Sequence, residues 1–214
     1  MAGCCDPSGY RHLFNSKEAS RRLRAYEHKG LDPMAKKLVG FLDGAGVAGS
    51  SVLEVGGGIG SLHAELVEAG AASAVNVEIS SGYETHASML LDQKGVADRV
   101  ERRIGDFTEL AADLSADIVV MNRVVCCYPF MQRLMGAALG SARRHLALTF
   151  PRSNPVSRTV SRLGNAYCRI RHVDFQSYIH DPAAIIGIAR EAGFDPVFDD
   201  RNLVWRGVVL TRVS

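Results

Sequence analysis

The chain has 214 residues, of which 47% are hydrophobic and 22% charged, and these values are typical of one globular domain. They exclude a collagen-like repeat, a coiled coil and a long disordered tail. The net charge of +2 is too balanced to indicate a nucleic acid or a membrane as partner. No apolar run approaches the ~20 residues that a membrane span needs, and no secretory signal is visible at the first residues. We therefore expect a cytoplasmic protein.

The cysteines do not form a metal-binding pattern. Two pairs are adjacent in sequence, Cys4 with Cys5 and Cys126 with Cys127, and Cys168 stands alone. None has the C-x-x-C spacing of a zinc site, and adjacent cysteines rarely pair with each other. We expect reduced thiols and no metal.

Residues 1–46 are expected to form a helical cap ahead of the first strand. A helix starts at Ser16 and is stopped by Gly30. A second helix begins at Asp32 and Pro33 and runs to about Asp43. Lysine and arginine outnumber acidic residues in this region.

Strands and helices alternate from Ser51 onward. Short apolar runs predict strands at residues 51–55, 74–78, 100–105, 117–121 and 145–150, with helices at 61–69, 83–94 and 130–142. Such alternation indicates a parallel sheet with helices on both faces.

The tail departs from this alternation. Residues 151–180 contain no clear strand and hold five arginines against one acid, so we expect a lid insertion there. A helix at 182–192 and two strands at 194–199 and 203–212 follow, and the short gap between these strands predicts an antiparallel hairpin. The predicted fold is therefore α/β, a single domain over residues 1–214. It has a doubly wound, Rossmann-like, seven-stranded sheet, mostly parallel with a C-terminal antiparallel hairpin, and a helical N-terminal cap.

A glycine-rich turn follows the first predicted strand. Glu54 precedes Gly56, Gly57, Gly58 and Gly60. Glycines let a ligand approach the backbone, and the next helix offers unpaired N–H groups. The spacing departs from the G-x-G-x-x-G of dinucleotide sites. A carboxylate before the glycines also repels a pyrophosphate but suits a ligand with an ammonium group.

The Glu-x-Gly-x-Gly-x-Gly pattern resembles the first motif of class I S-adenosylmethionine-dependent methyltransferases. This resemblance implies S-adenosylmethionine as cofactor, S-adenosylhomocysteine as product, and Glu54 with the four glycines as donor-binding residues. It extends to the ends of the next three strands. There it implies that Glu78, with Ile79 beside it, binds the ribose hydroxyls, that Asp106 and Phe107 hold the adenine, and that Asn122 lies beside the methyl donor.

A narrower resemblance is to the magnesium-protoporphyrin O-methyltransferase branch. It rests on Phe14-Asn15 followed by an arginine-rich helix, and on the run from Val124 to Pro129. Leu13 stands where that branch usually has a tyrosine, and Cys127 where it has a histidine. Tyr10, one helical turn earlier, is a candidate to replace the missing tyrosine at the donor site.

The methyl acceptor is expected to be a small anionic molecule. A carboxylate acceptor needs mainly alignment, whereas a hydroxyl also needs a base. Tyr128 and His180 are the leading candidates for catalytic residues, together with Arg123, which follows Asn122 and carries a planar guanidinium for an anionic group. His172 is a further candidate base and Arg152 a further anion-binding residue.

Four functions remain open from the residues alone. The leading one is a small-molecule O-methyltransferase, and the second is an RNA or protein methyltransferase, although nucleic acid is disfavoured by the near-neutral charge. The third is a non-catalytic protein that binds S-adenosylmethionine. The fourth, an NAD-dependent oxidoreductase, is disfavoured by the glycine spacing. No membrane partner is expected, and the sequence leaves the oligomeric state open.

Overall fold

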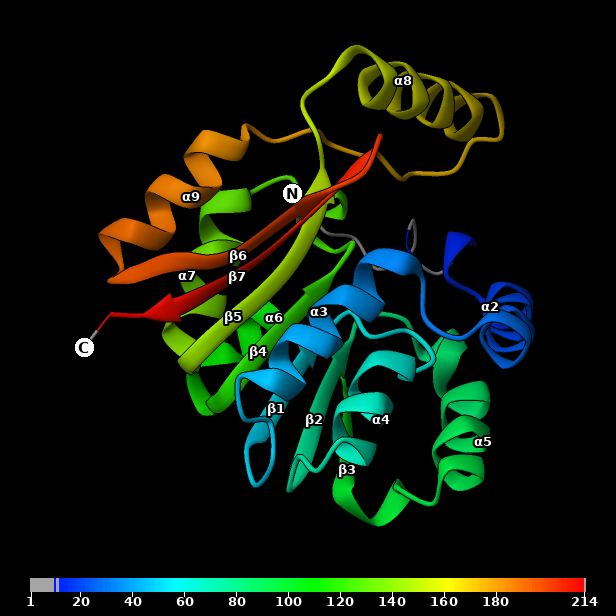
Figure 1. The fold of residues 1–214 in the computed structure, drawn as a ribbon. Coiled ribbons are helices and arrows are strands. Elements are labelled where there is room, and N and C mark those ends of the chain that lie inside the picture. The colour runs from blue at the N-terminus through cyan, green and yellow to red at the C-terminus, as the bar shows by residue number, and fades with distance from the viewer. Residues whose placement is uncertain (1–9, 11, 214) are drawn as a thin grey trace.

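The structure is a computed structural model that describes residues 10 and 12–213. Within them, seven strands form one sheet in the order β3-β2-β1-β4-β5-β7-β6 (Figure 1). Their bounds are β1 (Ser51–Val55), β2 (Ser73–Glu78), β3 (Val100–Ile104), β4 (Ala116–Asn122), β5 (Ala142–Pro151), β6 (Phe194–Arg201) and β7 (Trp205–Arg212). Cys4 and Cys5 lie outside the described residues.

The pairing of the strands confirms the predicted sheet. β1 to β5 run parallel to one another, whereas β7 runs antiparallel to both β5 and β6. The strand order reverses between β1 and β4, and open α/β sheets bind ligands at such a switch point, beyond the carboxyl ends of the strands. Both sides of that point therefore belong to the candidate site.

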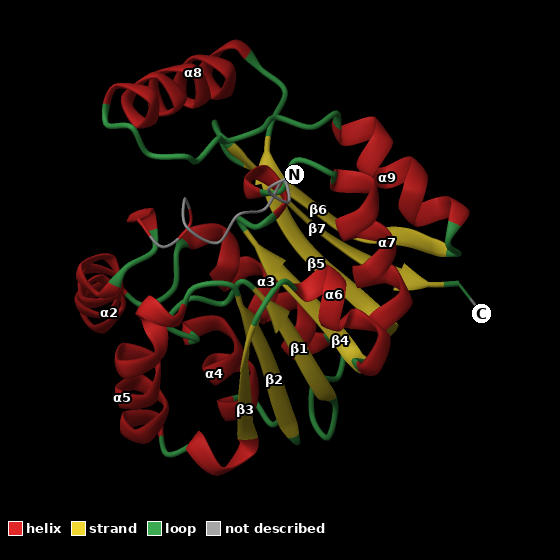
Figure 2. Ribbon diagram, turned by 180° about the vertical axis from the view of Figure 1, so that it is seen from behind, coloured by secondary structure: helices red, strands yellow, loops and turns green. Residues whose placement is uncertain are grey.

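Helices cover both faces of the sheet (Figures 1 and 2). The α-helices are α2 (Ser16–Lys29), α3 (Pro33–Gly44), α4 (Ser61–Glu68), α5 (Glu84–Lys94), α6 (Phe107–Leu110), α7 (Met131–Ser141), α8 (Pro155–Ile170) and α9 (Pro182–Glu191). Four short 3-10 helices are η1 (Ser81–Tyr83), η2 (Ala97–Arg99), η3 (Ala111–Asp113) and η4 (Val125–Cys127), all within the described ranges.

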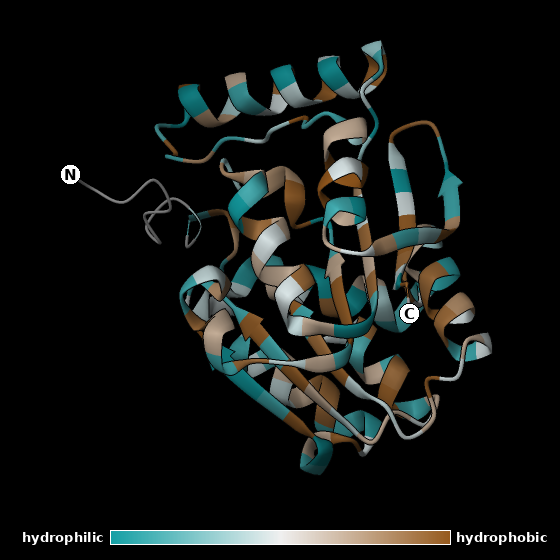
Figure 3. Cartoon of the chain, turned by 90° about the vertical axis from the view of Figure 1, so that its left-hand side faces the viewer, coloured by the Kyte–Doolittle hydropathy of each residue, from teal (hydrophilic) through white to brown (hydrophobic). Residues whose placement is uncertain are grey.

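Each face of the sheet has its own apolar core, and the apolar colour gathers along the inner strands (Figure 3). On one face, α3 and α4 bury residues such as Leu38 and Leu66 against the strands. On the other face, α7 and α9 bury Met135 and Ile185. Burial of these side chains on both faces is why the inner strands read as continuous apolar runs in the sequence.

The predicted helices of the N-terminal region are confirmed. Asn15 caps α2 by accepting a hydrogen bond from the Glu18 N–H, and Gly30 ends the helix with a positive φ of 69°. Asp32 caps α3, with Pro33 in the first turn. Both helices lie near the glycine turn, since Tyr26 of α2 donates a hydrogen bond to Glu65 of α4.

The tail contains one element that was not predicted. The segment without a predicted strand holds α8, a helix of 16 residues that lies on the outside of the molecule (Figures 1 and 2). Elsewhere the bounds differ by a few residues: β5 begins at Ala142 instead of 145, and β7 begins at Trp205 instead of 203. None of the helices in the described part of the chain combines the length and the apolar character of a membrane span.

Candidate active site

The glycine turn lies between the end of β1 and the start of α4, at the switch point of the sheet. Gly56, Gly58 and Gly60 have positive φ values of 64°, 57° and 83°. Side chains rarely tolerate such values, so the turn requires glycine at these three positions. A side chain at Gly57 would also collide with Asn76 and Glu54. The spacing of the glycines is therefore set by the backbone path of the turn.

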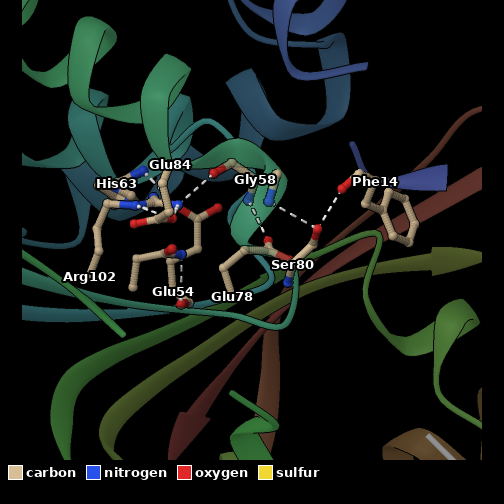
Figure 4. A network of polar contacts seen from close by, with 10 residues as sticks. Phe14, Glu54, Gly58, His63, Glu78, Ser80, Glu84 and Arg102 are labelled. Carbon is tan, nitrogen blue, oxygen red and sulfur yellow. Dashed lines mark hydrogen bonds and ion pairs between the residues drawn. The ribbon is translucent and has the colours of Figure 1, made fainter. Parts of the chain in front are cut away.

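Glu54 and His63 join the two sides of this turn (Figure 4). Both side chains are buried, and Glu54 Oε2 lies 2.6 Å from His63 Nδ1 and accepts a 3.1 Å hydrogen bond from the His63 N–H. Asn76 Nδ2 donates to the Glu54 carbonyl oxygen at 3.1 Å. These contacts hold β1, β2 and α4 together around the turn. His63 is thus a buried structural partner of Glu54, a role that its position in the sequence did not indicate.

Glu78 also supports the turn, from the end of β2. Its Oε2 accepts a 2.9 Å hydrogen bond from the Gly58 N–H, and its Oε1 accepts a 3.0 Å bond from the Ser80 N–H. Burial raises the pKa of Glu78, against the lowering effect of these hydrogen bonds and of Arg102. The Ser80 hydroxyl in turn donates to the Phe14 carbonyl oxygen, which fastens the N-terminal segment to the site (Figure 4).

Arg102 of β3 holds the turn from its other side. Its guanidinium donates to the Gly58 carbonyl oxygen at 3.0 Å and to Glu84 at 2.7 Å. Because the Arg102 side chain is only 9% exposed, this ion pair is better shielded from water than those on the surface. Gly58 is thus held through its N–H by Glu78 and through its carbonyl by Arg102.

A narrow apolar cavity opens beside the ends of β1 to β3. Its walls include Val55, Val77, Ile79, Phe107 and Leu134, and Asp106 stands among them. Asp106 caps α6, since its Oδ1 accepts hydrogen bonds from the Thr108 N–H and hydroxyl. These walls suit a flat, weakly polar ring with a hydrogen-bond donor at its edge.

Tyr128 belongs to this apolar cavity. Its hydroxyl lies 2.9 Å from the Thr108 hydroxyl and 3.3 Å from Asp106 Oδ2. His180 lies behind it, with Nε2 at 2.9 Å from the Tyr128 carbonyl oxygen. The structure therefore brings these two predicted catalytic residues together, next to Asp106.

A larger cavity of about 310 Å³ adjoins the glycine turn. Its lining includes Gly56, Gly58 and Glu78 together with Arg22, Arg123 and Trp205. A further cavity of about 530 Å³ continues along α2 and adds Arg21 and Lys29. The predicted donor residues and a group of cations thus share one connected region.

Asp32 positions the two predicted residues at the end of β4. Its carboxylate accepts a 3.2 Å hydrogen bond from Asn122 Nδ2 and pairs with the Arg123 guanidinium at 3.2 Å. Thr149 bridges the same pair, because its hydroxyl donates to Asn122 Oδ1 and accepts from the Arg123 N–H. Arg123 has a φ of 61°, a strained value for a residue with a side chain, and strain of this kind gathers at functional sites. Its guanidinium lies over the Trp205 ring, 4.8 Å from the centroid.

Aromatic side chains close the region on the side of the N-terminal segment. Tyr10 stacks on Phe14, and Phe175 meets both rings edge to face. The Tyr10 hydroxyl donates a 2.5 Å hydrogen bond to the Cys127 carbonyl oxygen, and Tyr10 lines both the apolar cavity and the 310 Å³ cavity. The predicted placement of Tyr10 at the donor site agrees with this position.

The remaining candidates lie as follows. Arg152 donates to the Asn202 carbonyl oxygen at 2.8 Å, so its guanidinium braces the β6–β7 loop. His172 is exposed. Cys126, Cys127 and Cys168 are free thiols, as expected. The adjacent Cys126 thiol and burial raise the pKa of Cys127, which keeps it protonated. No group of three or more metal-ligating side chains occurs among the described residues.

Comparisons with known proteins agree with this geometry. Residues 52–148 match the family model described as a methyltransferase domain. Over 93 residues the chain is 34% identical to ribosomal protein L11 methyltransferase of Haemophilus influenzae, which is 44% of this chain and 31% of that protein. The chain thus spans about a third of the length of the curated relatives it matches.

Two solved structures share the fold over nearly the whole chain. Magnesium protoporphyrin IX methyltransferase from Synechocystis PCC 6803, with bound S-adenosylhomocysteine, superposes with a TM-score of 0.76 at 21% identity, covering 97% of this chain and 100% of that one. An O-methyltransferase family protein from Burkholderia thailandensis has a TM-score of 0.67 at 17% identity, covering 94% and 64%.

The fold, the glycine turn and the domain match define one class of protein. Residues 52–148 match a methyltransferase domain, and the fold is the one that solved S-adenosylmethionine-dependent methyltransferases share. The resemblance drawn from Glu54 to Asn122 is thereby confirmed at the level of fold and class.

Proposed function

We propose that the protein transfers a methyl group from S-adenosylmethionine to an oxygen atom of a small anionic organic molecule. One observation carries the proposal. The 310 Å³ cavity is lined both by the glycine turn and Glu78 and by Arg22, Arg123 and Trp205. A donor and an anionic acceptor would both find recognition groups in that one cavity.

The donor set has the chemistry that S-adenosylmethionine requires. Glu78 presents a buried carboxylate whose oxygens accept hydrogen bonds from the Gly58 and Ser80 N–H groups. A carboxylate oxygen can accept more than one hydrogen bond, which suits a ribose diol. The apolar cavity would take the adenine between Ile79 and Phe107, with Asp106 at the amino group. Gly56, Gly57, Gly58 and Gly60 would place backbone near the amino-acid end.

Glu54 and Asn122 complete the proposed donor site. Both hydrogen bonds from His63 go to Glu54 Oε2, so we assign the contact with the donor ammonium to Oε1. Asn122 is held by Asp32 and Thr149 at the switch point, where the reacting groups would meet. When bound, S-adenosylmethionine supplies an electrophilic methyl group.

Alignment is the main task left to the protein for a carboxylate acceptor. Arg123 would bind the anionic group, and its contacts with Asp32 and Trp205 restrict the directions it can take. The Tyr128 hydroxyl contacts Asp106, and the His180 ring contacts the Tyr128 carbonyl oxygen. These contacts favour a positioning role for Tyr128 and His180. The aromatic group of Tyr10, Phe14 and Phe175 would exclude water from the transfer.

A protein substrate is the second candidate, and the similarity to ribosomal protein L11 methyltransferase favours it. Residues 52–148, which match the methyltransferase domain model, contain most of the proposed donor-binding residues, and methyltransferases with different acceptors can share such a segment. The identity of the methyl acceptor therefore depends on the other residues of the site.

Calorimetric titration with S-adenosylhomocysteine, beside a titration with NAD, tests the donor site. Binding of S-adenosylhomocysteine alone is the expected result. Binding of NAD alone would overturn the proposal, because the glycine turn would then serve a dinucleotide.

A methylation assay with labelled S-adenosylmethionine then tests the acceptor. The panel pairs aromatic carboxylates with the corresponding neutral alcohols and adds purified ribosomal protein. We expect turnover of the carboxylates, whereas label on the ribosomal protein alone would establish the second candidate. Donor binding without label on any substrate would support a protein that binds S-adenosylmethionine without catalysis.

A further inference from the structure

The outer face of α8 is apolar, although most surface helices turn such a face inward. Val156, Val160, Leu163, Tyr167 and Ile170 are spaced by four, three, four and three residues, which places them on one side of the helix. Their exposed fractions are 41%, 55%, 67%, 60% and 75%. Single exposed apolar residues need no explanation, but a continuous row along one helix indicates a contact surface.

The polar face of α8 packs on the body of the protein instead. The Ser157 hydroxyl donates to the Val204 carbonyl oxygen, and the Ser161 hydroxyl donates to the Ser177 carbonyl oxygen. Asn165 exchanges two hydrogen bonds with the backbone of Ser177. Turning the apolar row toward the cavities would break all of these bonds. The methyl acceptor is therefore a poor ligand for the apolar row.

The charge of α8 has a single sign. The helix contains Arg158, Arg162 and Arg169, all exposed, and no aspartate or glutamate. Arg171 and His172 follow directly after its end. Hydrophilic and hydrophobic segments alternate along the helix at the top of Figure 3. An apolar row on one face and arginines on another, with no acid present, is the pattern of helices that lie in the interface of an anionic lipid membrane.

We propose that α8 docks this protein on a membrane surface that carries anionic lipids. The helix would lie flat for its length of about 24 Å. Its apolar row would enter the boundary between headgroups and acyl chains, with Tyr167 at the depth where amphipathic rings collect. Leu203, 65% exposed, lies beside the start of the helix, since Asn154 donates to its carbonyl oxygen, and would add to the apolar surface.

A second copy of the chain is a weaker occupant for the same face. Pairing two α8 helices through their apolar rows would leave the arginines unused, because neither helix has an acid to pair with them, whereas an anionic membrane would engage both the apolar row and the arginines. That no helix among residues 10 and 12–213 could cross a membrane does not bear on the proposal, because an interfacial helix lies along the membrane.

Vesicle flotation with the full chain tests the docking. We expect binding to vesicles of equal parts phosphatidylcholine and phosphatidylglycerol, weakened by salt, and little binding to phosphatidylcholine alone. The double variant Leu163→Glu/Tyr167→Glu should lose at least about tenfold in partitioning, and Arg158→Gln should lose about fivefold. The matched control is Met89→Glu/Val197→Glu, which adds two charges at exposed apolar positions away from α8 and should keep binding.

A second measurement reports the position of the helix itself. In Leu163→Trp, emission should shift to the blue on anionic vesicles by more than in the parent chain, whose single tryptophan is Trp205. No binding to anionic vesicles would overturn the proposal. So would equal loss of binding in the control variant, or a dimer in solution that Leu163→Glu/Tyr167→Glu dissociates.

Discussion

Glu54 and His63 form a buried 2.6 Å hydrogen bond that links the end of β1 to the first turn of α4. The glycine turn lies between them in the sequence, so this contact closes the loop formed by Gly56 to Gly60. The hydrogen bond between the buried Glu54 carboxylate and His63 also fixes the orientation of the turn, which glycines alone do not do. The binding turn is therefore held by side chains that a ligand need not touch.

Replacing His63 tests this closure. We expect His63→Leu to lower the free energy of unfolding by about 1–3 kcal/mol, because Glu54 then loses a buried partner. Affinity for S-adenosylhomocysteine should fall as well, since the turn loses its support. Denaturant unfolding and calorimetry measure the two effects. His86→Leu is the control, because the buried Nδ1 of His86 has no hydrogen-bond partner in the described structure, and equal losses in both variants would contradict the interpretation.

The turn also makes a prediction at Gly60. A Cβ atom there would lie 2.6 Å from His63 Cε1, at a φ of 83°. Gly60→Ala should therefore destabilise the domain by about 1–3 kcal/mol from backbone strain. Gly136→Ala provides the contrast, since it lies within α7 with no atom within 4 Å of its added Cβ, and should stabilise by about 0.5–1 kcal/mol. Thermal unfolding distinguishes the two, and a gain in stability at Gly60 would refute the described turn.

Donor binding should depend on pH through Glu78. Burial raises its pKa above the usual 4.5, so part of the free protein carries the protonated acid just above that pH. Ribose hydroxyls would donate to the carboxylate, so affinity for S-adenosylhomocysteine should increase as pH rises through the raised pKa. The contribution of Glu78 to the free energy of unfolding has the opposite pH dependence. It is fully present below the pKa that Glu78 has in the unfolded chain, and it is lost as pH rises through the higher pKa of the folded chain.

Glu78→Gln isolates this effect. The variant should bind S-adenosylhomocysteine more weakly at neutral pH, by about fivefold for one lost hydrogen bond. The rise in affinity with pH should also disappear. Calorimetry at a series of pH values above 4.5 makes the comparison, and an unchanged pH profile would remove Glu78 from the donor site.

Much of the sheet was predictable because its signals are local. Parallel strands buried on both faces read as apolar runs, and the glycine turn carries its backbone requirement in its own residues. The positions at the strand ends, such as Glu78 and Asp106, followed from the family resemblance together with the expected topology. The class of the protein was therefore accessible from the segment between Glu54 and Asn122.

The parts that escaped prediction depend on contacts between distant residues. Asp32 was placed at the start of a helix, but its pairing with Arg123 requires α3 to meet the end of β4. The pairing of His63 with Glu54 was not predicted, because it follows from packing and has no signature in the sequence. The helix α8 was not predicted either, because the interpretation of residues 151–180 rested on their excess of arginine and did not use the spacing of their apolar residues.

His145 makes a prediction about stability at acidic pH. Burial lowers its pKa below 6.5, and the neighbouring Arg144 adds to the effect. The unfolded chain then takes up a proton that the folded chain resists, so the unfolding free energy should fall as pH drops below 6.5. His145→Gln should flatten this dependence, whereas His28→Gln, at an exposed position of α2, should retain it. Denaturant midpoints measured at a series of pH values below 6.5 make the comparison. The same pH dependence in both variants would contradict the assignment of the effect to His145.

The acceptor site can be tested at Arg123. With the aromatic carboxylate that the panel identifies, Arg123→Gln should raise KM about tenfold or more, because a charge-assisted contact is lost. Affinity for S-adenosylhomocysteine should stay within about twofold, and stability should change little, since the Arg123–Asp32 pair is partly exposed. Arg152→Gln is the matched control, because that guanidinium binds the Asn202 carbonyl oxygen and should leave KM unchanged. A rise in KM for Arg152→Gln alone would shift the anion site from β4 to the end of β5 and refute the proposed role of Arg123.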